Sequence, residues 1–263
     1  MSYQKVLIKY GGNAMISNPL KEQIATQIKK LLDHGIQVVL VHGGGPFIES
    51  ALQKAGIKSE FFEGQRITSL EALPVIERTL KGEVNGALVN IFNKTGMKAV
   101  GLSGKDGKLV TAQKISADLG YVGEVQQVNT HFLDLLLTNH YLPIVTCLGS
   151  DDEGNDYNIN GDTFAGKIAS ALQVDAYIVL TDVDGLYQRY PDPASLITQL
   201  TLADLPSHYH HTITGGMLPK ILSCENALSS GVKKTVILNG TKPEQISNYL
   251  LEHKIIGTTI TQH

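Results

Sequence analysis

The sequence predicts an α/β fold, a three-layer αβα sandwich with an open, mostly parallel central sheet. Short apolar runs, typical of buried strands, alternate with stretches of helical periodicity. Two of the apolar runs end in glycines, at Gly11-Gly12 and at Gly43-Gly44-Gly45. A repeated strand–helix–strand order favours parallel strands with helices on both faces of the sheet.

The first part of the chain is expected to hold two strands and two helices. Residues 6–8 predict the first strand, and residues 38–41 predict a second that is buried on both faces. A helix is expected between them, with Asn18 as N-cap, Pro19 at its first position and Gly35 after its end. Its apolar positions are Leu20, Ile24, Ile28 and Leu31. The second helix is expected over residues 46–55, before Gly56.

The rest of the chain repeats this order. Strands are predicted at residues 142–147, 177–180 and 235–238, with helices near 161–173 and from Lys242-Pro243 onwards. Other segments look different: 57–68 and 108–128 predict hairpins at a sheet edge, and 148–157 a polar loop. We expect a single domain over 1–263, with one lobe over 1–174 and another over 175–263.

Composition excludes several classes of protein. The 263 residues carry a net charge of −3, and 42% of them are hydrophobic, enough for a sizeable core. Basic residues form only pairs such as Lys29-Lys30, not the basic face of a nucleic-acid-binding protein. The chain shows no signal peptide and no apolar run near the roughly 20 residues of a membrane span. We therefore expect a cytoplasmic protein in which Cys147 and Cys224 remain buried thiols.

The glycine loops are candidates for phosphate binding. Glycine lets the backbone approach a ligand, and a helix that begins after such a loop offers free N–H groups and a favourable dipole. A tight turn without a ligand is the alternative for one glycine pair. The spacing fits neither the dinucleotide fingerprint nor the P-loop, so the predicted phosphate site belongs to another class.

Three charged residues are candidates for catalysis. Lys9 stands where a buried strand meets the first glycine loop, a costly place for a lysine unless an anion meets it. Lys220 stands near the expected start of a helix, and Asp162 precedes another helix, where it could also serve only as N-cap. Two lysines held by one aspartate would supply the positive charge that phosphoryl transfer needs. Lys105 and Lys167 are further candidates.

Eight short motifs follow one another along nearly the whole chain. They are Lys9-Tyr-Gly-Gly, His42-Gly-Gly-Gly-Pro, Gly64-Gln-Arg66-Ile-Thr68, Gly101-Leu-Ser-Gly-Lys-Asp106, Gly120-Tyr-Val-Gly-Glu-Val125, Tyr157-Asn-Ile-Asn-Gly-Asp162, Leu180-Thr-Asp-Val-Asp-Gly-Leu186 and Gly215-Gly-Met-Leu-Pro-Lys220. Each is weak alone, but in this order the set resembles the acetylglutamate kinases, which belong to the amino-acid kinase family.

The resemblance implies a role for each matching residue. Lys9 and Lys220 would stabilise the transferring phosphoryl group, and Asp162 would orient both lysines. The resemblance also implies binding residues, which are Gly12, Gly44 and Gly45 as backbone donors around the γ-phosphoryl group, and Arg66 and Asn158 as the clamp on the acylated amino acid. An arginine suits this task because its planar fork can grip a carboxylate, although from sequence alone Arg66 could equally be a surface residue.

The second lobe resembles the nucleotide-binding lobe of this family. Thr181, Asp182 and Gly185 would lie at the end of a parallel strand, where open α/β sheets bind ligands, with Met217 nearby. The implied reaction transfers phosphate from ATP to the side-chain carboxylate of N-acetylglutamate. Magnesium would arrive with the ATP phosphates and water, so no protein metal ligand and no tightly bound cofactor is expected.

Three residues depart from the usual family pattern. Gln65 stands where Leu is more common, Gly161 replaces Ala, and Phe164 is bulkier than usual. None removes a charge, but Gln65 could tune the acyl-amino-acid pocket. His208, His210 and His211 suggest a metal site, yet no Cys or carboxylate cluster accompanies them, which favours a solvated loop.

Other functions remain open on the sequence alone. Related kinases act on aspartate, glutamate, carbamate, uridine monophosphate or carrier-bound aminoadipate, and the motifs do not reveal side-chain length. A non-catalytic regulator on the same fold would be expected to lack a lysine or the aspartate. The resemblance and the prevalence of twofold assemblies imply a homodimer that pairs through the lobe over 1–174. Because residues 1–4 are too short for a stable helix, we expect no inhibition by arginine.

Overall fold

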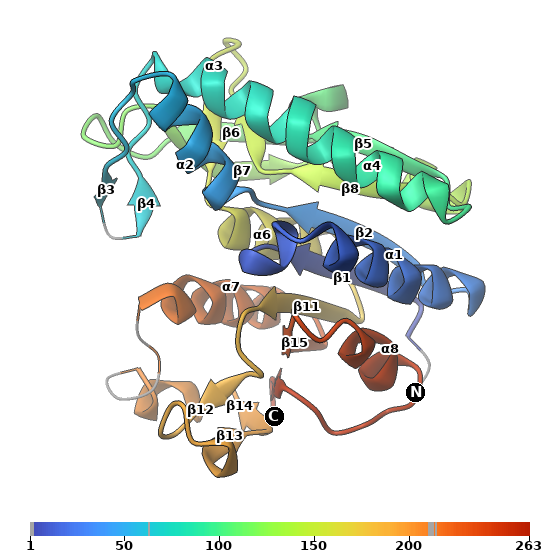
Figure 1. The fold of residues 1–263 in the computed structure, drawn as a ribbon. Coiled ribbons are helices and arrows are strands. Elements are labelled where there is room, and N and C mark those ends of the chain that lie inside the picture. Colours follow the sequence, from blue (N-terminus) through green and yellow to red (C-terminus); the bar gives the residue numbers. More distant parts are fainter. Residues whose placement is uncertain (1–2, 63, 210–212, 214) are drawn as a thin grey trace.

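The computed structural model describes residues 3–62, 64–209, 213 and 215–263, and its centre is one eight-stranded sheet (Figure 1). The strands of this sheet are β1 (Lys5–Tyr10), β2 (Gln37–His42), β5 (Ala99–Ser103), β8 (Leu142–Thr146), β11 (Ala176–Thr181), β14 (Gln199–Thr201), β15 (Lys234–Asn239) and β16 (Thr258–Thr261). They follow the order β14-β16-β15-β11-β1-β2-β8-β5, and every neighbouring pair is parallel except β15 and β16. The predicted open, mostly parallel sheet is confirmed.

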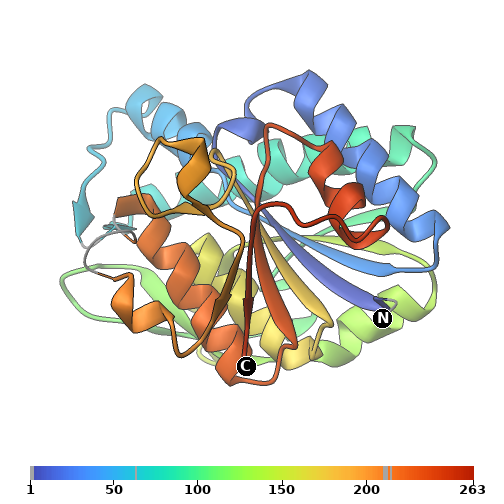
Figure 2. The ribbon, with the colours of Figure 1, turned by 90° about the horizontal axis from the view of Figure 1, so that it is seen from below.

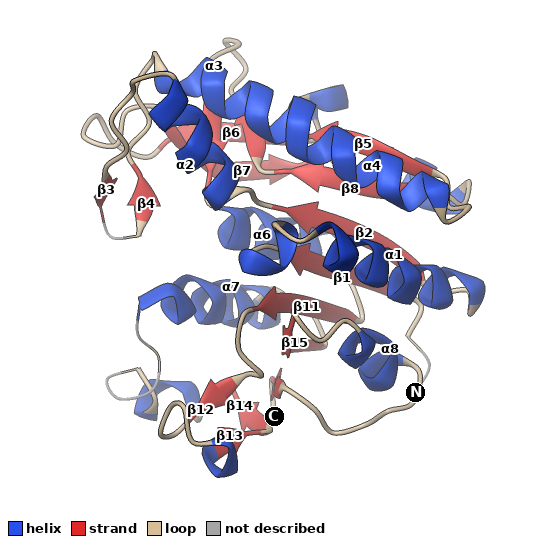
Figure 3. Cartoon of the chain, in the orientation of Figure 1, coloured by secondary structure: helices blue, strands red, loops and turns tan. Residues whose placement is uncertain are grey.

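Helices cover both faces of the sheet and complete three layers (Figures 2 and 3). The helices are α1 (Asn18–Asp33), α2 (Gly45–Lys54), α3 (Ala72–Glu77), α4 (Asn85–Lys94), α5 (Thr130–Thr138), α6 (Gly161–Leu172), α7 (Leu218–Ser229) and α8 (Glu244–Leu250). Helix α1 packs against α4 and α8 on one face, whereas α6 packs against α5 and α7 on the other. A π-helical segment, Arg78–Val84, joins α3 to α4.

Two apolar cores lie on opposite faces of the sheet. Leu7 of β1 belongs to the core beneath α6, with Phe164 and Ile168. The next residue, Ile8, belongs to the core beneath α1, with Ile28. Because successive strand side chains point to opposite faces, both faces of β1 are apolar, which explains why the run shows no polar alternation.

Several short strands lie outside the central sheet. Strands β6 (Val110–Lys114), β7 (Val122–Val128), β9 (Leu148–Ser150) and β10 (Asp156–Ile159) pair in a closed ring; β3 (Phe61–Phe62) pairs with β4 (Gln65–Arg66), and β12 (Leu186–Tyr187) with β13 (Leu196–Ile197). The expected polar loop over 148–157 is therefore wrong at both ends, because β9 and β10 pair with each other and leave only 151–155 between them.

Two helix starts also differ from the expectation. Ser17, not Asn18, is the N-cap of α1, since its side chain accepts a hydrogen bond from the Leu20 N–H. Asn18 is the first helical residue instead, and its amide oxygen accepts from Lys21. The last helix begins at Glu244, just after the expected Lys242-Pro243. Both cysteines are buried and free, as predicted.

The first lobe, 1–174, and the second, 175–263, form two adjacent halves of the same sheet. Strands β2, β5 and β8 extend from β1 in one direction, whereas β11, β15, β16 and β14 extend in the other. Strand β1 pairs directly with β11, with Val6 opposite Ala176. Within the residues that the structure describes, no helix combines the length and apolar character needed to cross a membrane.

Candidate active site

A pocket of about 310 Å³ lies at the carboxyl ends of β1 and β2. The residues that line it include Lys9, Gly11, Gly12, Gly43, Gly44, Gly45, Phe61, Gln65, Arg66, Asn158 and Asp162. This is the edge where open parallel sheets bind ligands. A larger cavity of about 450 Å³ lies beside Tyr3, Tyr249 and β16, but neither glycine loop and none of the candidate catalytic residues lines it.

Two lysines converge on one aspartate beside this pocket. Lys9 comes from the end of β1, Asp162 from the first turn of α6, and Lys220 from the first turn of α7. Lys9 Nζ lies 2.7 Å from Asp162 Oδ1, and Lys220 Nζ lies 3.2 Å from Asp162 Oδ2. The side chains of Lys9 and Asp162 are each 8% exposed, and that of Lys220 is 18% exposed. The predicted constellation is thus brought together by three separate elements.

The local structure leaves the Asp162 carboxylate free for the lysines. Asn160 is the N-cap of α6, and its Oδ1 accepts hydrogen bonds from the N–H groups of Asp162 and Thr163 at 2.9 and 3.1 Å. Asp162 is therefore not the N-cap, the alternative that the sequence allowed. Its position in the first helical turn also places a carboxylate where the helix dipole favours negative charge.

Electrostatics in this cluster favour an anionic ligand. Burial on its own raises the pKa of Asp162, but Lys9 and Lys220 outweigh that effect and hold the pKa below its usual value. Burial and the charge of Lys9 lower the pKa of Lys220, although Asp162 opposes them. With both lysines protonated, the cluster carries one net positive charge where little water screens it.

The glycine loops bring backbone donors to the same place. Helix α2 begins at Gly45, directly after β2 and Gly43-Gly44. The first N–H groups of a helix have no partner inside the helix, so they are available to an anion. The loop after β1 is tied to the end of β11, because Asp182 accepts from the backbone and side-chain nitrogens of Asn13 at 3.0 and 3.1 Å.

Arg66 lines the same pocket as Lys9 and Asp162. Its Nη1 donates to Glu49 Oε2 at 2.6 Å and to Ser59 Oγ, and its guanidinium carbon lies 4.5 Å from the centre of the Phe61 ring. The Arg66 side chain is only 8% exposed, so it is not the surface residue that the sequence also allowed. The Arg66 hydrogen bond holds the pKa of the Glu49 carboxyl below its usual value. Asn158 lines the same pocket and donates to Thr68 Oγ1 at 3.1 Å.

Of the residues expected to bind nucleotide, Gly12 lines this pocket, but the other four, Thr181, Asp182, Gly185 and Met217, lie outside its walls. Thr181 ends β11, and its carbonyl accepts from the N–H of Gly240 at 2.7 Å. Asp182 faces the Asn13 loop, whereas Gly185 packs near Thr258 and Leu196. Met217, just before α7, is partly buried against the core beneath α6. The structure therefore gathers Thr181 and Asp182 near the first glycine loop but not Gly185.

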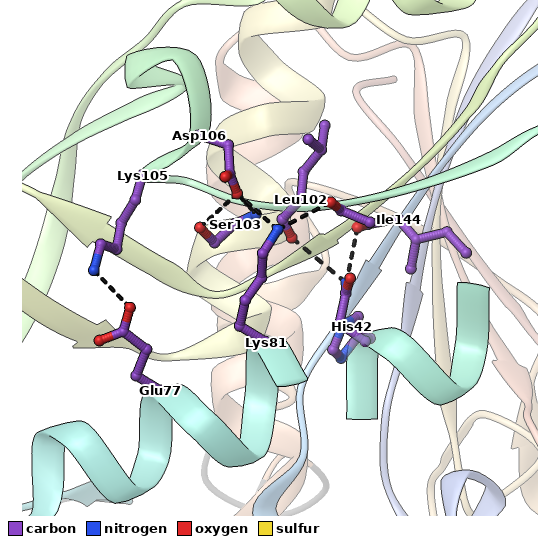
Figure 4. A network of polar contacts seen from close by, with 10 residues as sticks. His42, Glu77, Lys81, Leu102, Ser103, Lys105, Asp106 and Ile144 are labelled. Atoms are coloured by element: carbon purple, nitrogen blue, oxygen red, sulfur yellow. Dashed lines mark hydrogen bonds and ion pairs between the residues drawn. The ribbon is translucent and has the colours of Figure 1, made fainter. Parts of the chain in front are cut away.

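The other sequence candidates do not join the site. Lys105 pairs with Glu77 at 2.6 Å (Figure 4) and with Asp156, also at 2.6 Å. Lys167 is exposed on α6. Of the three histidines, His208 is described, but His210 and His211 lie outside the described residues. Among the described residues, no group of three or more His, Cys, Asp or Glu side chains could hold a metal ion.

Several residues with roles around the site were not predicted from the sequence. Glu49 and Ser59 bind Arg66, Asn13 binds Asp182, and Asn160 caps α6. Asn160 carried a usable signal, since an Asn directly before a predicted helical segment is a common N-cap. The other contacts join residues 7 to 169 positions apart, at spacings that no helix or strand pattern reveals.

An open parallel sheet whose glycine loops adjoin two lysines on a shared aspartate defines a phosphate-handling α/β protein. The chain belongs to the amino acid kinase family, whose sequence pattern matches residues 4–239. It is 42% identical to the acetylglutamate kinase of Methanocaldococcus jannaschii, covering 99% of this chain and 91% of the relative. It is 41% identical to the acetylglutamate kinase of Methanococcus maripaludis strain C7, covering 98% and 92%. A crystal structure from Streptococcus mutans is similar with a TM-score of 0.83 and 28% identity, covering 98% and 99%.

Proposed function

We infer that this chain is an enzyme that transfers the γ-phosphoryl group of ATP to the side-chain carboxylate of N-acetyl-L-glutamate. The products are N-acetylglutamyl 5-phosphate and ADP, which places the reaction in arginine biosynthesis. The observation that carries this conclusion is the similarity, over nearly the whole length, to acetylglutamate kinases. The contact of Lys9, Asp162 and Lys220 beside a pocket that contains Arg66 supports it, because this chemistry needs those charges.

The proposed mechanism relies on positioning and charge rather than on a base. The substrate carboxylate is ionised at neutral pH, so it can attack the γ-phosphorus directly. Lys9 and Lys220 would offset the negative charge on the transferring group and on the leaving oxygen. Asp162 would hold both ammonium groups in place, and the N–H groups of Gly12, Gly44 and Gly45 would bind the phosphoryl oxygens.

We propose that each lobe binds one of the two substrates. The lobe over 1–174 would bind N-acetylglutamate through Arg66 and Asn158, and the lobe over 175–263 would bind ATP through Thr181, Asp182, Gly185 and Met217. Magnesium would enter with the ATP phosphates, since the Asp162 carboxylate beside the pocket is already paired with both lysines.

The test is a phosphorylation assay across related carboxylates, in which hydroxylamine traps the acyl phosphate. N-acetylglutamate is expected to be a better acceptor than free glutamate or aspartate, because a free ammonium group would lose the hydrogen bonds of the acyl-amide nitrogen. Carrier-bound aminoadipate and uridine monophosphate are the competing substrates. A higher kcat/KM for one of them would replace the proposed substrate, and no turnover at all would favour a non-catalytic regulator.

Arg66→Ala is expected to raise KM for N-acetylglutamate by about 10- to 100-fold, with a much smaller effect on kcat. A hydrogen bond to a charged group contributes about 1.5–3 kcal/mol, which corresponds to that range. Steady-state kinetics with varied N-acetylglutamate measure it. Arg189→Ala is the control, because Arg189 is exposed and pairs with Asp192, outside the lining of the pocket. An unchanged KM in Arg66→Ala would remove Arg66 from the proposed clamp.

The pH dependence of the reaction should report Lys220. Its pKa is lowered in the free protein, so the protonated form is lost below the usual pKa of 10.5 as pH rises. The value of kcat/KM for ATP is therefore expected to fall at lower pH than kcat does, since bound phosphates favour the ammonium form. Lys220→Arg, which stays protonated, should remove this alkaline decline. Identical alkaline limbs for kcat and kcat/KM would contradict the assignment.

We propose a cytoplasmic homodimer as the working form of the protein. Twofold pairing of identical surfaces is the commonest assembly of soluble enzymes. Light scattering of the purified protein measures the state directly, and a monomer would contradict it.

A further inference from the structure

A buried histidine directly precedes the triple-glycine loop and takes no part in the proposed reaction. His42 is the last residue of β2, and Gly43, Gly44 and Gly45 follow it. Its side chain is fully buried. We infer that His42 and Asn85 are positioning residues, which fix the orientation of the peptide units in the triple-glycine loop for phosphoryl transfer. This inference rests on the proposed function.

The hydrogen bonds of His42 show which of its two ring nitrogens carries the hydrogen. Its Nδ1 lies 2.8 Å from the carbonyl oxygen of Gly43, and its Nε2 lies 2.9 Å from Asn85 Nδ2. Asn85 Nδ2 also donates to the carbonyl of Ile144 at 2.9 Å, which fixes which end of the amide faces the histidine. A carbonyl only accepts, so Nδ1 carries the hydrogen and Nε2 accepts from Asn85.

The surroundings keep the imidazole neutral. Burial, together with the nearby charge of Lys81, lowers the pKa of His42 to about 4, although the hydrogen bond to Gly43 opposes them. A neutral imidazole has one N–H group, and Asn85 donates its hydrogen bond to the other nitrogen, Nε2, which carries no hydrogen. Asn85 therefore selects the tautomer that donates to Gly43.

The hydrogen bond from His42 to the Gly43 carbonyl fixes the orientation of the peptide unit between Gly43 and Gly44. The unit between Gly43 and Gly44 is planar and trans, so the N–H of Gly44 points opposite to the Gly43 carbonyl and away from the imidazole. Gly44 itself lines the pocket. Holding the carbonyl on the histidine thus holds a proposed phosphoryl-binding N–H in one direction.

The π-helical segment leads directly into Asn85, one of the two positioning residues. Asn85 begins α4 directly after Arg78–Val84, and π-helical turns often occur at functional sites. The amide fits closely against β5, because a Cβ on Gly101 would lie 2.1 Å from Asn85 Oδ1. Leu80 of the same segment packs against the loop, where a Cβ on Gly44 would lie 2.6 Å from Leu80 Cδ2.

An ion pair anchors this segment to the sheet. Lys81 Nζ donates to the carbonyl of Gly101 at 2.9 Å and lies 2.8 Å from Asp106 Oδ2 (Figure 4). Asp106 in turn accepts from the Ser103 N–H and hydroxyl at 2.6 and 2.8 Å. Residues 80–85 therefore contact both β5 and the triple-glycine loop, so they couple the loop to the rigid sheet.

Asn85→Ala is expected to lower kcat by about 10-fold or more, while KM for N-acetylglutamate stays within about twofold. A small misplacement of a positioned group costs up to about 100-fold in rate. Asn93→Ala is the matched control: Asn93 lies on the same helix and also binds β5, through the N–H and carbonyl of Ala99, but does not touch His42. Equal losses of kcat in both variants, or an unchanged kcat in Asn85→Ala, would overturn the inference.

A second measurement needs no variant and no turnover. In the ¹⁵N spectrum of the wild-type protein between about pH 6 and 8, His42 is expected as the neutral Nδ1–H tautomer. An Nε2–H tautomer or an imidazolium would overturn the inference. Because this spectrum does not depend on the substrate, failure of the proposed function and failure of the positioning role are separable.

Discussion

Lys220→Ala and Lys9→Ala are each expected to lower kcat by about 100-fold or more, with a much smaller effect on KM for N-acetylglutamate. Removing one preorganised group that stabilises transition-state charge costs about 2.7–4 kcal/mol. Both lysines contact Asp162 rather than Arg66, so the proposed amino-acid clamp stays intact. Steady-state kinetics with each substrate varied in turn measure the two effects separately.

Lys21→Ala is the control for removing a buried lysine. Lys21 is 7% exposed and donates to Asn18 within α1, away from the pocket. Its kcat should be close to that of the wild type. If a folded Lys9 or Lys220 variant kept a near-normal kcat, the charge-stabilising pair would be disproved.

Asp162→Asn is expected to lower both stability and kcat. The change removes the negative charge that both lysines share, and breaking a buried ion pair from one side costs about 3–5 kcal/mol. For a chain of this size that corresponds to a fall in Tm of about 10 °C. Added ATP should raise the Tm of the variant by more than that of the wild type, because its phosphates supply negative charge near the two ammonium groups.

Calorimetry with and without ATP measures this prediction, and Asp134→Asn supplies the comparison. Asp134 pairs with Lys5 at 2.9 Å, but its side chain is 46% exposed. An exposed ion pair contributes at most about 1 kcal/mol. Equal Tm values for the two variants would mean that Asp162 is not the electrostatic centre of the cluster.

The sequence predicted the parts of the fold that depend on local pattern. Apolar runs such as residues 38–41 became central strands, and the glycines after them lie at the edge where ligands bind. Helix starts were less secure, since Ser17 and Asn18 both suit an N-cap and only the actual hydrogen bond decides between them. The polar segment around β9 and β10 was missed because its strands pair with each other in a small ring.

The candidate site was likewise predicted only in part from the sequence. Motif resemblance chose Lys9, Asp162 and Lys220, and the fold brings them into contact. No pattern could indicate Glu49 beside Arg66 or Asn85 beside His42, because these contacts join residues on different elements. The π-helical turn before Asn85 adds to the difficulty, since it shifts the helical phase on which periodicity depends.

The burial of Arg66 reduces the amount of water that a ligand must displace when it binds. The Arg66 side chain is 8% exposed, and its guanidinium contacts Glu49, Ser59 and Phe61, so the side chain lost most of its hydration shell when the chain folded. A carboxylate that enters the pocket must shed its own water but has little to strip from the cation. Because the internal partner Glu49 already neutralises the guanidinium, binding releases few mobile counterions, and the affinity for an acylated amino acid should change little with ionic strength.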